Sequence, residues 1–344
     1  MYLKLLRRIF PKRKIVNKYR SILKTNPDRR IFILDIPTNG NVGDQAIVFA
    51  TREFLFDNLG NFGVVEIPYT EVNSILRFLK KNVQEDDLVL WNGGGNIGDL
   101  YQSSEIVRWA TFNLLRKFPI VIFPQSVYFQ NMNFMNRSIK AYKKDNVTLF
   151  LREKKSFEIV DKNFSVKHYL SPDIAFYLEG KLPDKIFSQS RNGVVTLLRD
   201  DMERKKHDFS RLYKVLAEMD MDVINSDTYV RGVDVTVKNR KKILYDKLYE
   251  ISQKELVVTD RLHGMIFAYL TKTPAIVVEN NNWKIKSTYD TWLKDVPSIE
   301  LVDVDDKSIN LERKVLRILG EKTEYHNISQ NFNGLLNVVK RINE

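Results

Sequence analysis

The stretch LVVTDRLHGMIFAYLTKTPAIVV, residues 256–278, decides the fold class. It begins with a short β-branched run, continues with an apolar helical pattern closed by Thr273-Pro274, and ends with a second β-branched run. Two such runs joined by a helix are typical of a βαβ unit, in which the strands are parallel. The stretch therefore predicts a parallel sheet covered by helices.

The same alternation extends along the chain in both directions. Further strands are predicted at 31–36, 88–91, 120–123, 148–151, 193–198 and 221–224, beside those at 256–259 and 275–278. Helices are predicted at 44–58, 70–81, 103–117, 211–219, 234–252, 261–270, 310–319 and 328–342. Strands that alternate with helices of this length indicate an α/β fold with parallel sheets.

The pattern breaks over residues 178–192, where Gly, Pro and polar residues interrupt it. We therefore expect two Rossmann-like halves that face a ligand cleft. The predicted parts are a basic leader (1–24), an N-terminal domain (25–185), a C-terminal domain that holds the donor site (186–320), and a helical segment that packs back on the first half (321–344).

Composition excludes several classes of chemistry. The 344 residues include no cysteine, which excludes disulfide scaffolds, thiolate zinc sites, iron–sulfur clusters and cysteine nucleophiles. No acidic cluster has the spacing of metal ligands. We expect a protein that needs no cofactor and no metal, in the reducing environment of the cytoplasm.

The charge is concentrated at the N-terminus. Residues 1–24 carry nine Lys or Arg and no acidic residue, and they lack the apolar run and cleavage site of a secretory signal. This leader is either a solvated helix packed on the domain behind it or a segment that lies on an anionic membrane surface. Elsewhere 46 basic residues face 43 acidic ones without a basic stripe, so we expect no nucleic acid as partner.

One five-residue pattern occurs twice, as Gly40-Asn41-Val42-Gly43-Asp44 and as Gly95-Asn96-Ile97-Gly98-Asp99. Each copy follows a predicted buried strand and precedes a predicted helix, the place where open parallel sheets bind ligands. Glycine lets the backbone approach an anion, and free N–H groups at a helix start favour negative charge. The alternative is a pair of tight turns capped by Asn and Asp. The spacing matches neither the dinucleotide fingerprint nor the Walker motif.

A second candidate site is Thr259-Asp260-Arg261-Leu262-His263-Gly264, at the start of the helix in the deciding stretch. An arginine there can bind a carboxylate or phosphate together with the helix dipole. A histidine two residues later can reach the same anion and exchange a proton near neutral pH.

Further polar residues follow other predicted strands. Gln125 follows the strand at 120–123, Arg152 follows the strand at 148–151, and Asn282 and Lys284 lie in the Asn-rich loop after 275–278. The carboxyl ends of parallel strands share one edge of a sheet, so these side chains are candidates for the same site.

Taken in order, these motifs resemble the polysaccharide pyruvyl transferase family. The resemblance runs from about residue 30 to Trp292, and it rests on the twin glycine loops, Gly93–Asp99 among them, on Pro-Gln-Ser (124–126), Leu-Arg-Glu (151–153), Ser-Pro-Asp (171–173), Asp-Arg-Leu-His-Gly (260–264) and Asn-Xaa-Lys (282–284). It implies a glycosyltransferase-B-like architecture, phosphoenolpyruvate as donor and a sugar of a surface or secreted polysaccharide as acceptor. It also implies a pyruvate ketal as product.

The family's donor residues match His263, Arg261, Arg152 and Lys284 of this chain. To the donor set we add Asn282 and the glycine-loop residues Gly94, Gly95 and Asn96. The predicted acceptor set is Asn41, Asp44, Asp99 and Gln125. His263 is the expected general acid or phosphate-holding group, assisted by Arg261, and Asp44 or Asp99 is the expected acceptor of a hydroxyl proton.

Two other functions are compatible with these residues. A nucleotide-sugar-dependent glycosyltransferase of polysaccharide biosynthesis has the same architecture and binds a diphosphate at a helix start. A non-catalytic partner in a polysaccharide assembly complex needs only the fold. The basic leader also makes a lipid-linked acceptor at the inner membrane face a hypothesis of the sequence.

Overall fold

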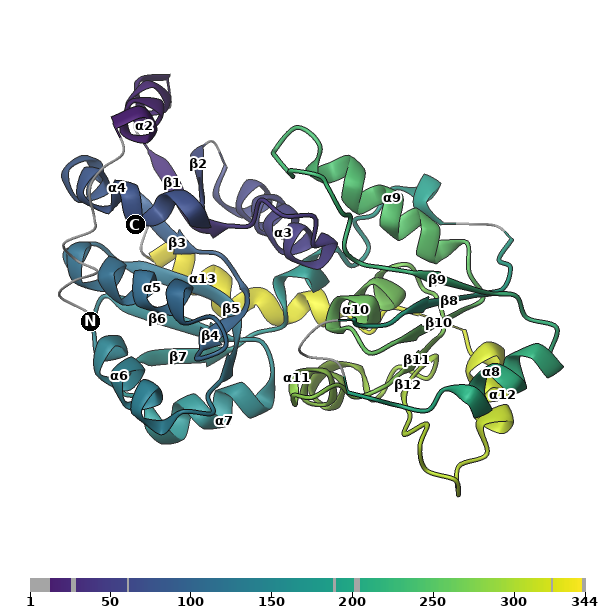
Figure 1. Cartoon of the computed structure of the whole chain (residues 1–344). Coiled ribbons are helices and arrows are strands. Elements are labelled where there is room, and N and C mark those ends of the chain that lie inside the picture. The colour runs from purple at the N-terminus through teal and green to yellow at the C-terminus, as the bar shows by residue number, and fades with distance from the viewer. Residues whose placement is uncertain are drawn as a thin grey trace. The chain divides into compact units, whose positions relative to one another are not determined.

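The computed structural model describes residues 13–25, 29–60, 62–187, 190–200, 205–322 and 324–341 (Figure 1). They form two compact units. Unit 1 comprises the described parts of Met1–Thr38, Ala50–Ile174 and Asn331–Glu344, and unit 2 comprises those of Asn39–Phe49 and Ala175–Gln330. The expected domains differ from these units at residues 39–49 and 175–185, which the sequence analysis assigned to the first half, and at residues 321–330, which it expected to pack on that half.

Unit 1 is built on a parallel sheet. Its strands, in the order β2-β1-β3-β5-β6-β7 with β4 paired to β5, are β1 (Arg30–Ile36), β2 (Gly63–Pro68), β3 (Leu88–Trp91), β4 (Gly94–Gly98), β5 (Ile120–Tyr128), β6 (Val147–Leu151) and β7 (Lys167–Leu170). Its helices are α2 (Arg13–Thr25), most of α3 (Val42–Leu59), α4 (Tyr69–Asn82), α5 (Gln102–Leu114), α6 (Met132–Tyr142), α7 (Lys154–Asn163) and α13 (Asn333–Arg341).

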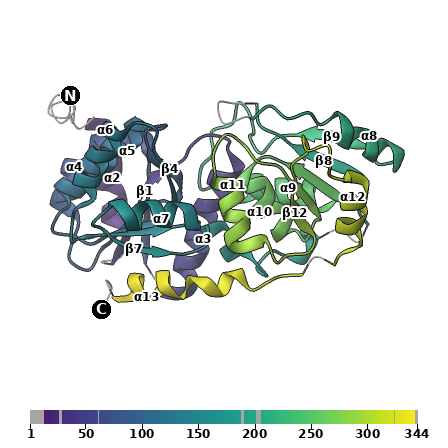
Figure 2. The same cartoon turned by 90° about the horizontal axis from the view of Figure 1, so that it is seen from below.

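The core of unit 1 follows from its apolar strands. All residues of β1 and β3 are buried, as expected for strands covered on both faces. Helices α4 and α5 cover one face of the sheet, and α13 lies on the other (Figure 2). On the α4 side, Phe32 and Trp91 pack with Ile75 and Phe112 in one cluster of buried side chains.

Unit 2 is a smaller parallel sheet. Its strands, in the order β12-β11-β10-β8-β9, are β8 (Val194–Leu197), β9 (Val223–Ser226), β10 (Leu256–Thr259), β11 (Ala275–Val277) and β12 (Ile299–Leu301). Its helices are the first turns of α3, then α8 (Ser210–Glu218), α9 (Arg240–Ser252), α10 (Leu262–Leu270), α11 (Lys284–Thr288) and α12 (Leu311–Gly320). A short 3₁₀ turn lies at Asp184–Ile186 in unit 2, and two more, at Ile174–Leu178 and Ile328–Phe332, cross the boundary between the units. Tyr289–Leu293 of unit 2 forms a π-helical turn.

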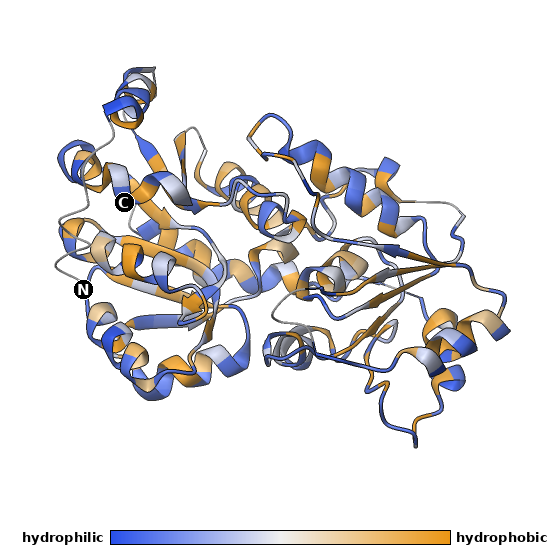
Figure 3. Cartoon of the chain, in the orientation of Figure 1, coloured by the Kyte–Doolittle hydropathy of each residue, from blue (hydrophilic) through white to orange (hydrophobic). Residues whose placement is uncertain are grey.

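Helices α8 and α12 pack on one face of the sheet of unit 2. Leu256 and Val258 of β10 pack in one cluster with Leu212 of α8 and Val315 of α12. Figure 3 shows that the central strands of both sheets are hydrophobic, whereas the exposed turns of the helices carry hydrophilic residues.

The predicted α/β class with parallel sheets is confirmed, and each of the eight predicted strands is present. The sequence analysis missed β2, β4, β7 and β12. β7 (KHYL) is an edge strand with mostly exposed side chains, so its sequence lacks the apolar run that marks a buried strand.

The leader lies partly outside the described residues, since the description begins at Arg13. The part that is described forms α2, whose Tyr19 is buried and donates a hydrogen bond of 2.5 Å to Glu71 of α4. Within the described ranges, no helix is both long and apolar enough to cross a membrane.

Candidate active site

The turn between β10 and α10 positions Arg261 and His263. The hydroxyl of Thr259 donates to the carbonyl of Leu197 at 2.9 Å and accepts the backbone N–H of Arg261 at 3.0 Å. A Cβ added to Gly264 would lie 2.3 Å from the same hydroxyl oxygen, so the helix start packs directly against the strand end. This contact places His263 in the first turn of α10.

The guanidinium of Arg261 is held between two partners. Its Nη2 lies 2.8 Å from Oδ1 of Asp227 and donates to the carbonyl of Leu198 at 3.2 Å, and 12% of its side chain remains exposed. The neighbouring carboxylate of Asp260 accepts the N–H of Arg199 at 2.7 Å. Burial raises the pKa of Asp260 above its ordinary value, and that hydrogen bond opposes the shift.

The first glycine loop belongs to the same unit as this turn, although more than 200 residues separate them in sequence. The N–H of Val42 donates to the carbonyl of Thr228 at 2.8 Å, and the N–H of Val230 donates to the carbonyl of Gly40 at 2.8 Å. A Cβ added to Gly43 would lie 2.2 Å from Nδ1 of His263. The backbone of the loop therefore lies flat against the imidazole, and this position requires glycine.

Asn41 and Asp44 sit at the start of α3. The side-chain oxygen of Asn41 accepts the N–H of Gly43 at 3.1 Å, which is the capping role that the sequence analysis left open for this loop. Asp44 lies in the first helical turn, where a carboxylate interacts favourably with the helix dipole. In unit 2 the starts of two helices, α3 and α10, thus meet at His263.

Asn282 and Lys284 lie in the loop after β11 and at the start of α11. The side-chain oxygen of Asn280 accepts the N–H of Asn282 at 3.1 Å, and that of Asn282 accepts the N–H of Lys284 at 3.1 Å. All three residues are buried, with the Lys284 residue 6% exposed. The Asn-rich sequence therefore builds a rigid turn that carries a cation at the carboxyl end of β11.

The second glycine loop differs from the first, although its sequence is nearly the same. Gly94–Gly98 forms the added strand β4, and α5 begins only at Gln102. Gly94 and Gly98 have φ values of 142° and 135°, and a Cβ at Gly98 would lie 1.7 Å from the carbonyl oxygen of Tyr128. The expectation that this copy also places N–H groups at a helix start was wrong, because the glycines here let β4 pair closely with β5.

The sequence analysis missed a buried network beside this loop. Oδ2 of Asp35, at the end of β1, accepts the indole N–H of Trp91 at 3.0 Å and the amide of Asn96 at 2.8 Å. Arg108 of α5 donates to the amide oxygen of Asn96 and pairs with Glu105. Burial raises the pKa of Glu105, and the charge of Arg108 opposes that shift.

One signal in the sequence could have identified this network, because Asp35 is a charged residue inside the apolar run of β1. The structure adds that Asp35 has a φ of 68°, which is unusual for a residue other than glycine. Backbone strain of this kind concentrates at functional sites. Glu105 and Arg108 gave no such signal, because charged residues three apart in a helix are ordinary on a surface.

Arg152 is buried at the end of β6. Its Nη1 lies 2.7 Å from Oδ2 of Asp173, its Nε donates to the hydroxyl of Ser126 at 2.7 Å, and Glu153 is 3.6 Å away. Asp173 belongs to the Ser-Pro-Asp motif but was not among the predicted site residues. The carboxylate of Asp173 offsets the positive charge of Arg152.

Gln125 and Asp99 use their side chains to hold the backbone. The Gln125 amide donates to the carbonyl of Asn92 at 2.8 Å and accepts the N–H of Asn96 at 3.2 Å, and the residue is fully buried. Oδ2 of Asp99 accepts the N–H groups of Gln130 and Asn131. These two of the four side chains predicted to contact an acceptor therefore hold the backbone, Gln125 that around β4 and Asp99 that at the start of α6.

The predicted residues divide between the two units. Unit 2 brings together the glycine loop with Asn41 and Asp44, the Arg261–His263 turn, and the Asn282–Lys284 turn. Unit 1 holds Gly94, Gly95, Asn96, Asp99, Gln125 and Arg152. Across the described ranges, no group of three or more His, Asp or Glu residues forms a cluster that could hold a metal ion.

Comparison with known proteins identifies relatives of this chain. The sequence model of the polysaccharide pyruvyl transferase family matches residues 41–282. General stress protein 30 of Bacillus subtilis is 32% identical over 318 residues, which cover 90% of this chain and 91% of that protein. Pyruvyl transferase 1 of Schizosaccharomyces pombe is 29% identical, over 82% of this chain and 75% of that protein.

The fold is also found among solved structures. The structure of UDP-GlcNAc 2-epimerase from Methanocaldococcus jannaschii aligns with a TM-score of 0.53 over 91% of this chain and 99% of that chain. At 15% identity this likeness concerns the fold alone. The family match, in contrast, includes both glycine loops, Arg152 and the Arg261–His263 turn. The chain belongs to the polysaccharide pyruvyl transferase family and is a transferase enzyme.

Proposed function

We propose that this enzyme transfers a pyruvyl group from phosphoenolpyruvate to a saccharide and forms a pyruvate ketal, without a cofactor or a metal. The observation that carries the proposal is the meeting of two helix starts at His263, with Arg261 beside it and the backbone of Gly43 against the ring. The helix starts and Arg261 can bind an anion, and His263 can give that anion a proton.

The donor carries a phosphate and a carboxylate, so its site needs several cations and N–H donors. Arg261 and Lys284 of unit 2 and Arg152 of unit 1 are the proposed cations. The buried turn around Asn282 and the glycine loops with Gly94, Gly95 and Asn96 complete the proposed donor set. Guanidinium groups bind phosphate and carboxylate in bidentate geometry, which favours arginine for this task.

The reaction needs one proton delivered to carbon and two removed from hydroxyls. In our scheme, His263 in its protonated form gives a proton to the methylene carbon of phosphoenolpyruvate, which makes C2 electrophilic. One sugar hydroxyl attacks C2 and loses its proton to a carboxylate. The C–O bond to phosphate then breaks, and the second hydroxyl attacks as its proton returns to His263. Inorganic phosphate leaves with the proton that the carboxylate accepted.

Asp44 is the carboxylate we propose for the hydroxyl proton. It lies in the same unit as His263 and one residue after Gly43. Asp99, the other candidate, already accepts two backbone N–H groups through Oδ2. Oδ2 of Asp99 is thereby engaged in holding the backbone at the start of α6.

Calorimetric titration of the full chain with phosphoenolpyruvate tests the donor. We expect saturable binding that the Arg261→Ala variant loses and the Arg313→Ala variant keeps, since Arg313 is an exposed arginine of α12 in the same unit. A parallel titration with UDP tests the alternative donor. Binding of UDP with no response to phosphoenolpyruvate would assign the enzyme to nucleotide-sugar chemistry instead.

A His263→Ala variant tests the acid. General acid–base catalysis is worth roughly 10²–10⁴-fold, so phosphate release with a saccharide acceptor should fall by at least the lower figure. A loss below about tenfold, with donor binding intact, would remove His263 from the chemistry.

We further propose a lipid-linked acceptor and a cytoplasmic enzyme that binds the inner membrane face through residues 1–24. The described structure refines the test of this leader. Tyr19 is buried against α4, so deletion through residue 24 would expose the core of unit 1. Deletion of residues 1–12 leaves α2 in place. If this deletion leaves binding to anionic vesicles unchanged, residues 1–12 are not the anchor.

A further inference from the structure

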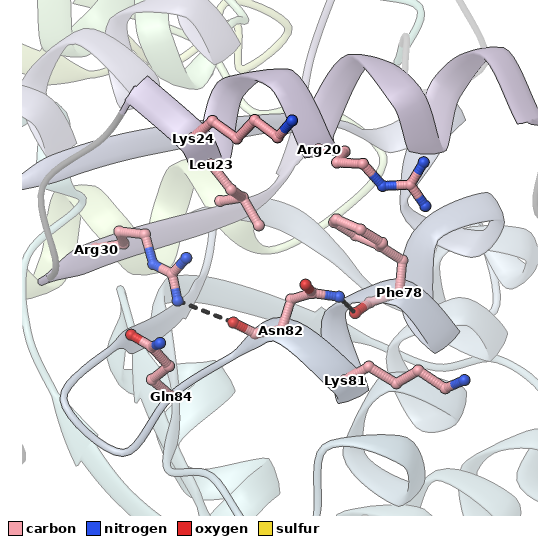
Figure 4. A pocket seen from close by; sticks show the side chains of 8 residues that line it. All are labelled: Arg20, Leu23, Lys24, Arg30, Phe78, Lys81, Asn82 and Gln84. Atoms are coloured by element: carbon pink, nitrogen blue, oxygen red, sulfur yellow. Dashed lines mark hydrogen bonds between the residues drawn. The ribbon is translucent and has the colours of Figure 1, made fainter.

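Unit 1 contains a cavity of about 320 Å³ at the edge of the sheet where β1 begins (Figure 4). A volume near 300 Å³ is at the lower end of the range for small-molecule sites. It lies among α2, α4, the start of β1 and the turn before β3, and its lining residues are Arg20, Leu23, Lys24, Arg30, Phe78, Lys81, Asn82 and Gln84.

This cavity is separate from the candidate active site. Arg30 is the first residue of β1, whereas Asp35 lies near the last residue of that strand and the second glycine loop follows the end of β3. A strand of seven residues spans roughly 20 Å. A ligand in the cavity therefore does not touch Gly94, Gly95 or Asn96, which belong to the proposed donor set.

The lining is positively charged and contains no acidic side chain. Arg30 is compensated within the protein, because Nη2 lies 2.6 Å from Oδ2 of Asp87 and donates to the carbonyl of Asn82 at 2.8 Å. Arg20, Lys24 and Lys81 have no carboxylate within 4.0 Å among the residues that the structure describes.

The position of these charges favours an external anion. Arg20 and Lys24 are four residues apart on α2, so they lie on the same helix face, and like charges at this spacing destabilise a helix. Lys81 approaches from α4 on the other side (Figure 4). A phosphate between the two helices would relieve this repulsion.

The walls of the cavity are fixed. Tyr19 is 1% exposed, and its hydroxyl donates to Glu71 of α4, which also pairs with Lys18 at 2.8 Å. Between the cationic rims, Leu23 of α2 and Phe78 of α4 supply a half-buried apolar surface. The cavity thus combines a phosphate-binding rim with an apolar wall.

We propose that this cavity binds the phosphate of an anionic lipid head group. The inference rests on the proposed membrane association, which it extends from the leader to α4 and the sheet edge. A lipid is favoured over a soluble phosphate because the apolar wall suits the part of a lipid next to its phosphate. The chain that precedes α2 also carries Leu3, Leu5, Leu6, Ile9 and Phe10 among its basic residues.

The test measures binding of the full chain to vesicles of phosphatidylglycerol mixed with phosphatidylcholine, and to phosphatidylcholine alone. The pocket variant combines Arg20→Ala, Lys24→Ala and Lys81→Ala. Each cation near an anionic leaflet changes partitioning by about fivefold, so the triple variant should bind roughly 100-fold more weakly. Neutral vesicles should bind neither protein.

A charge-matched control keeps net charge from deciding the result. Arg116→Ala, Arg137→Ala and Lys140→Ala remove three exposed cations of the same unit that do not line the cavity. This control should lose less than about threefold in vesicle binding. Both triple variants should keep the thermal midpoint and the turnover of the wild type on a soluble acceptor.

Three results would overturn the proposal. Equal losses in both triple variants would show that net charge alone drives binding. Unchanged binding of the pocket variant, with binding lost on deletion of residues 1–12, would keep the leader as the anchor and reject the cavity. Binding of free glycerol phosphate that the pocket variant loses, without any vesicle binding, would assign a soluble ligand. Phosphoenolpyruvate titration remains independent of all three results.

Discussion

Replacing Asp35 by glycine and, separately, by alanine tests the strained end of β1. Both changes delete the carboxylate that accepts hydrogen bonds from Trp91 at 3.0 Å and from Asn96 at 2.8 Å. An unsatisfied buried donor costs about 1–3 kcal/mol, and Trp91 is the buried donor of the two, so both variants should be less stable than the wild type by roughly 1–3 kcal/mol.

The two variants differ only in the Cβ atom. Asp35 has a φ of 68°, where an L residue costs about 1–2 kcal/mol and glycine does not. Glycine loses about 0.5–1 kcal/mol to the greater freedom of its unfolded chain. The difference leaves the glycine variant more stable by up to about 1.5 kcal/mol, and each kcal/mol corresponds to roughly 2–4 °C for a domain of 150–250 residues.

Thermal denaturation followed by circular dichroism measures this order. Gly334→Ala is the matched control, because Gly334 lies in helix α13 and an added Cβ meets no atom within 4 Å. There alanine should be more stable than glycine by about 0.5–1 kcal/mol. If alanine is also the more stable residue at position 35, the left-handed backbone described for Asp35 is refuted.

Three further predictions concern the site and its surroundings. Gly43→Ala places a Cβ 2.2 Å from Nδ1 of His263 and should lower turnover at least 100-fold. The far-UV circular dichroism spectrum should stay the same. Near-normal turnover would mean that this loop does not hold the ring. Asp173→Ala leaves the buried guanidinium of Arg152 without its partner at 2.7 Å and should destabilise unit 1 by about 3–5 kcal/mol in urea unfolding. A loss below about 1 kcal/mol would contradict this ion pair. Hydrogen bonds from the backbone N–H of Asp208 and from the ring of His207 hold the pKa of Asp305 below its ordinary value of 3.8. The stability that Asp305 contributes is therefore present above pH 3.8 and is lost as the pH falls through the lower pKa of the folded state. Asp305→Asn should flatten that part of an acid-unfolding curve, and an unchanged curve would contradict the assignment.

Local patterns in the sequence predicted much of the fold. The strand predicted at 256–259 and the helix predicted at 261–270 match β10 and α10 within one residue. They could be predicted because buried parallel strands and the helices that connect them consist of nearly continuous apolar residues. β4 escaped prediction since GGNIG contains no apolar pattern. Its strand pairing depends on β5, which lies over 20 residues later.

The candidate site was predicted only in part. Arg261 and His263 were predicted because an arginine and a histidine at a helix start can bind an anion and exchange a proton. Asp35 was not predicted as a site residue, and Asp173 was quoted only as part of the Ser-Pro-Asp motif. Each holds a predicted site residue in place, and these pairings could not be predicted because the partners are distant in sequence.

The amino-acid sequence by itself determined the α/β class, eight of the parallel strands and the family, since these depend on short-range periodicity and on motif order. Only the tertiary structure decided that two nearly identical glycine loops have different roles. The first loop joins unit 2 and lies against His263, and the second becomes strand β4 of unit 1. Glycine permits both conformations, so the surrounding contacts, Thr228 and Val230 for one loop and β5 for the other, select between them.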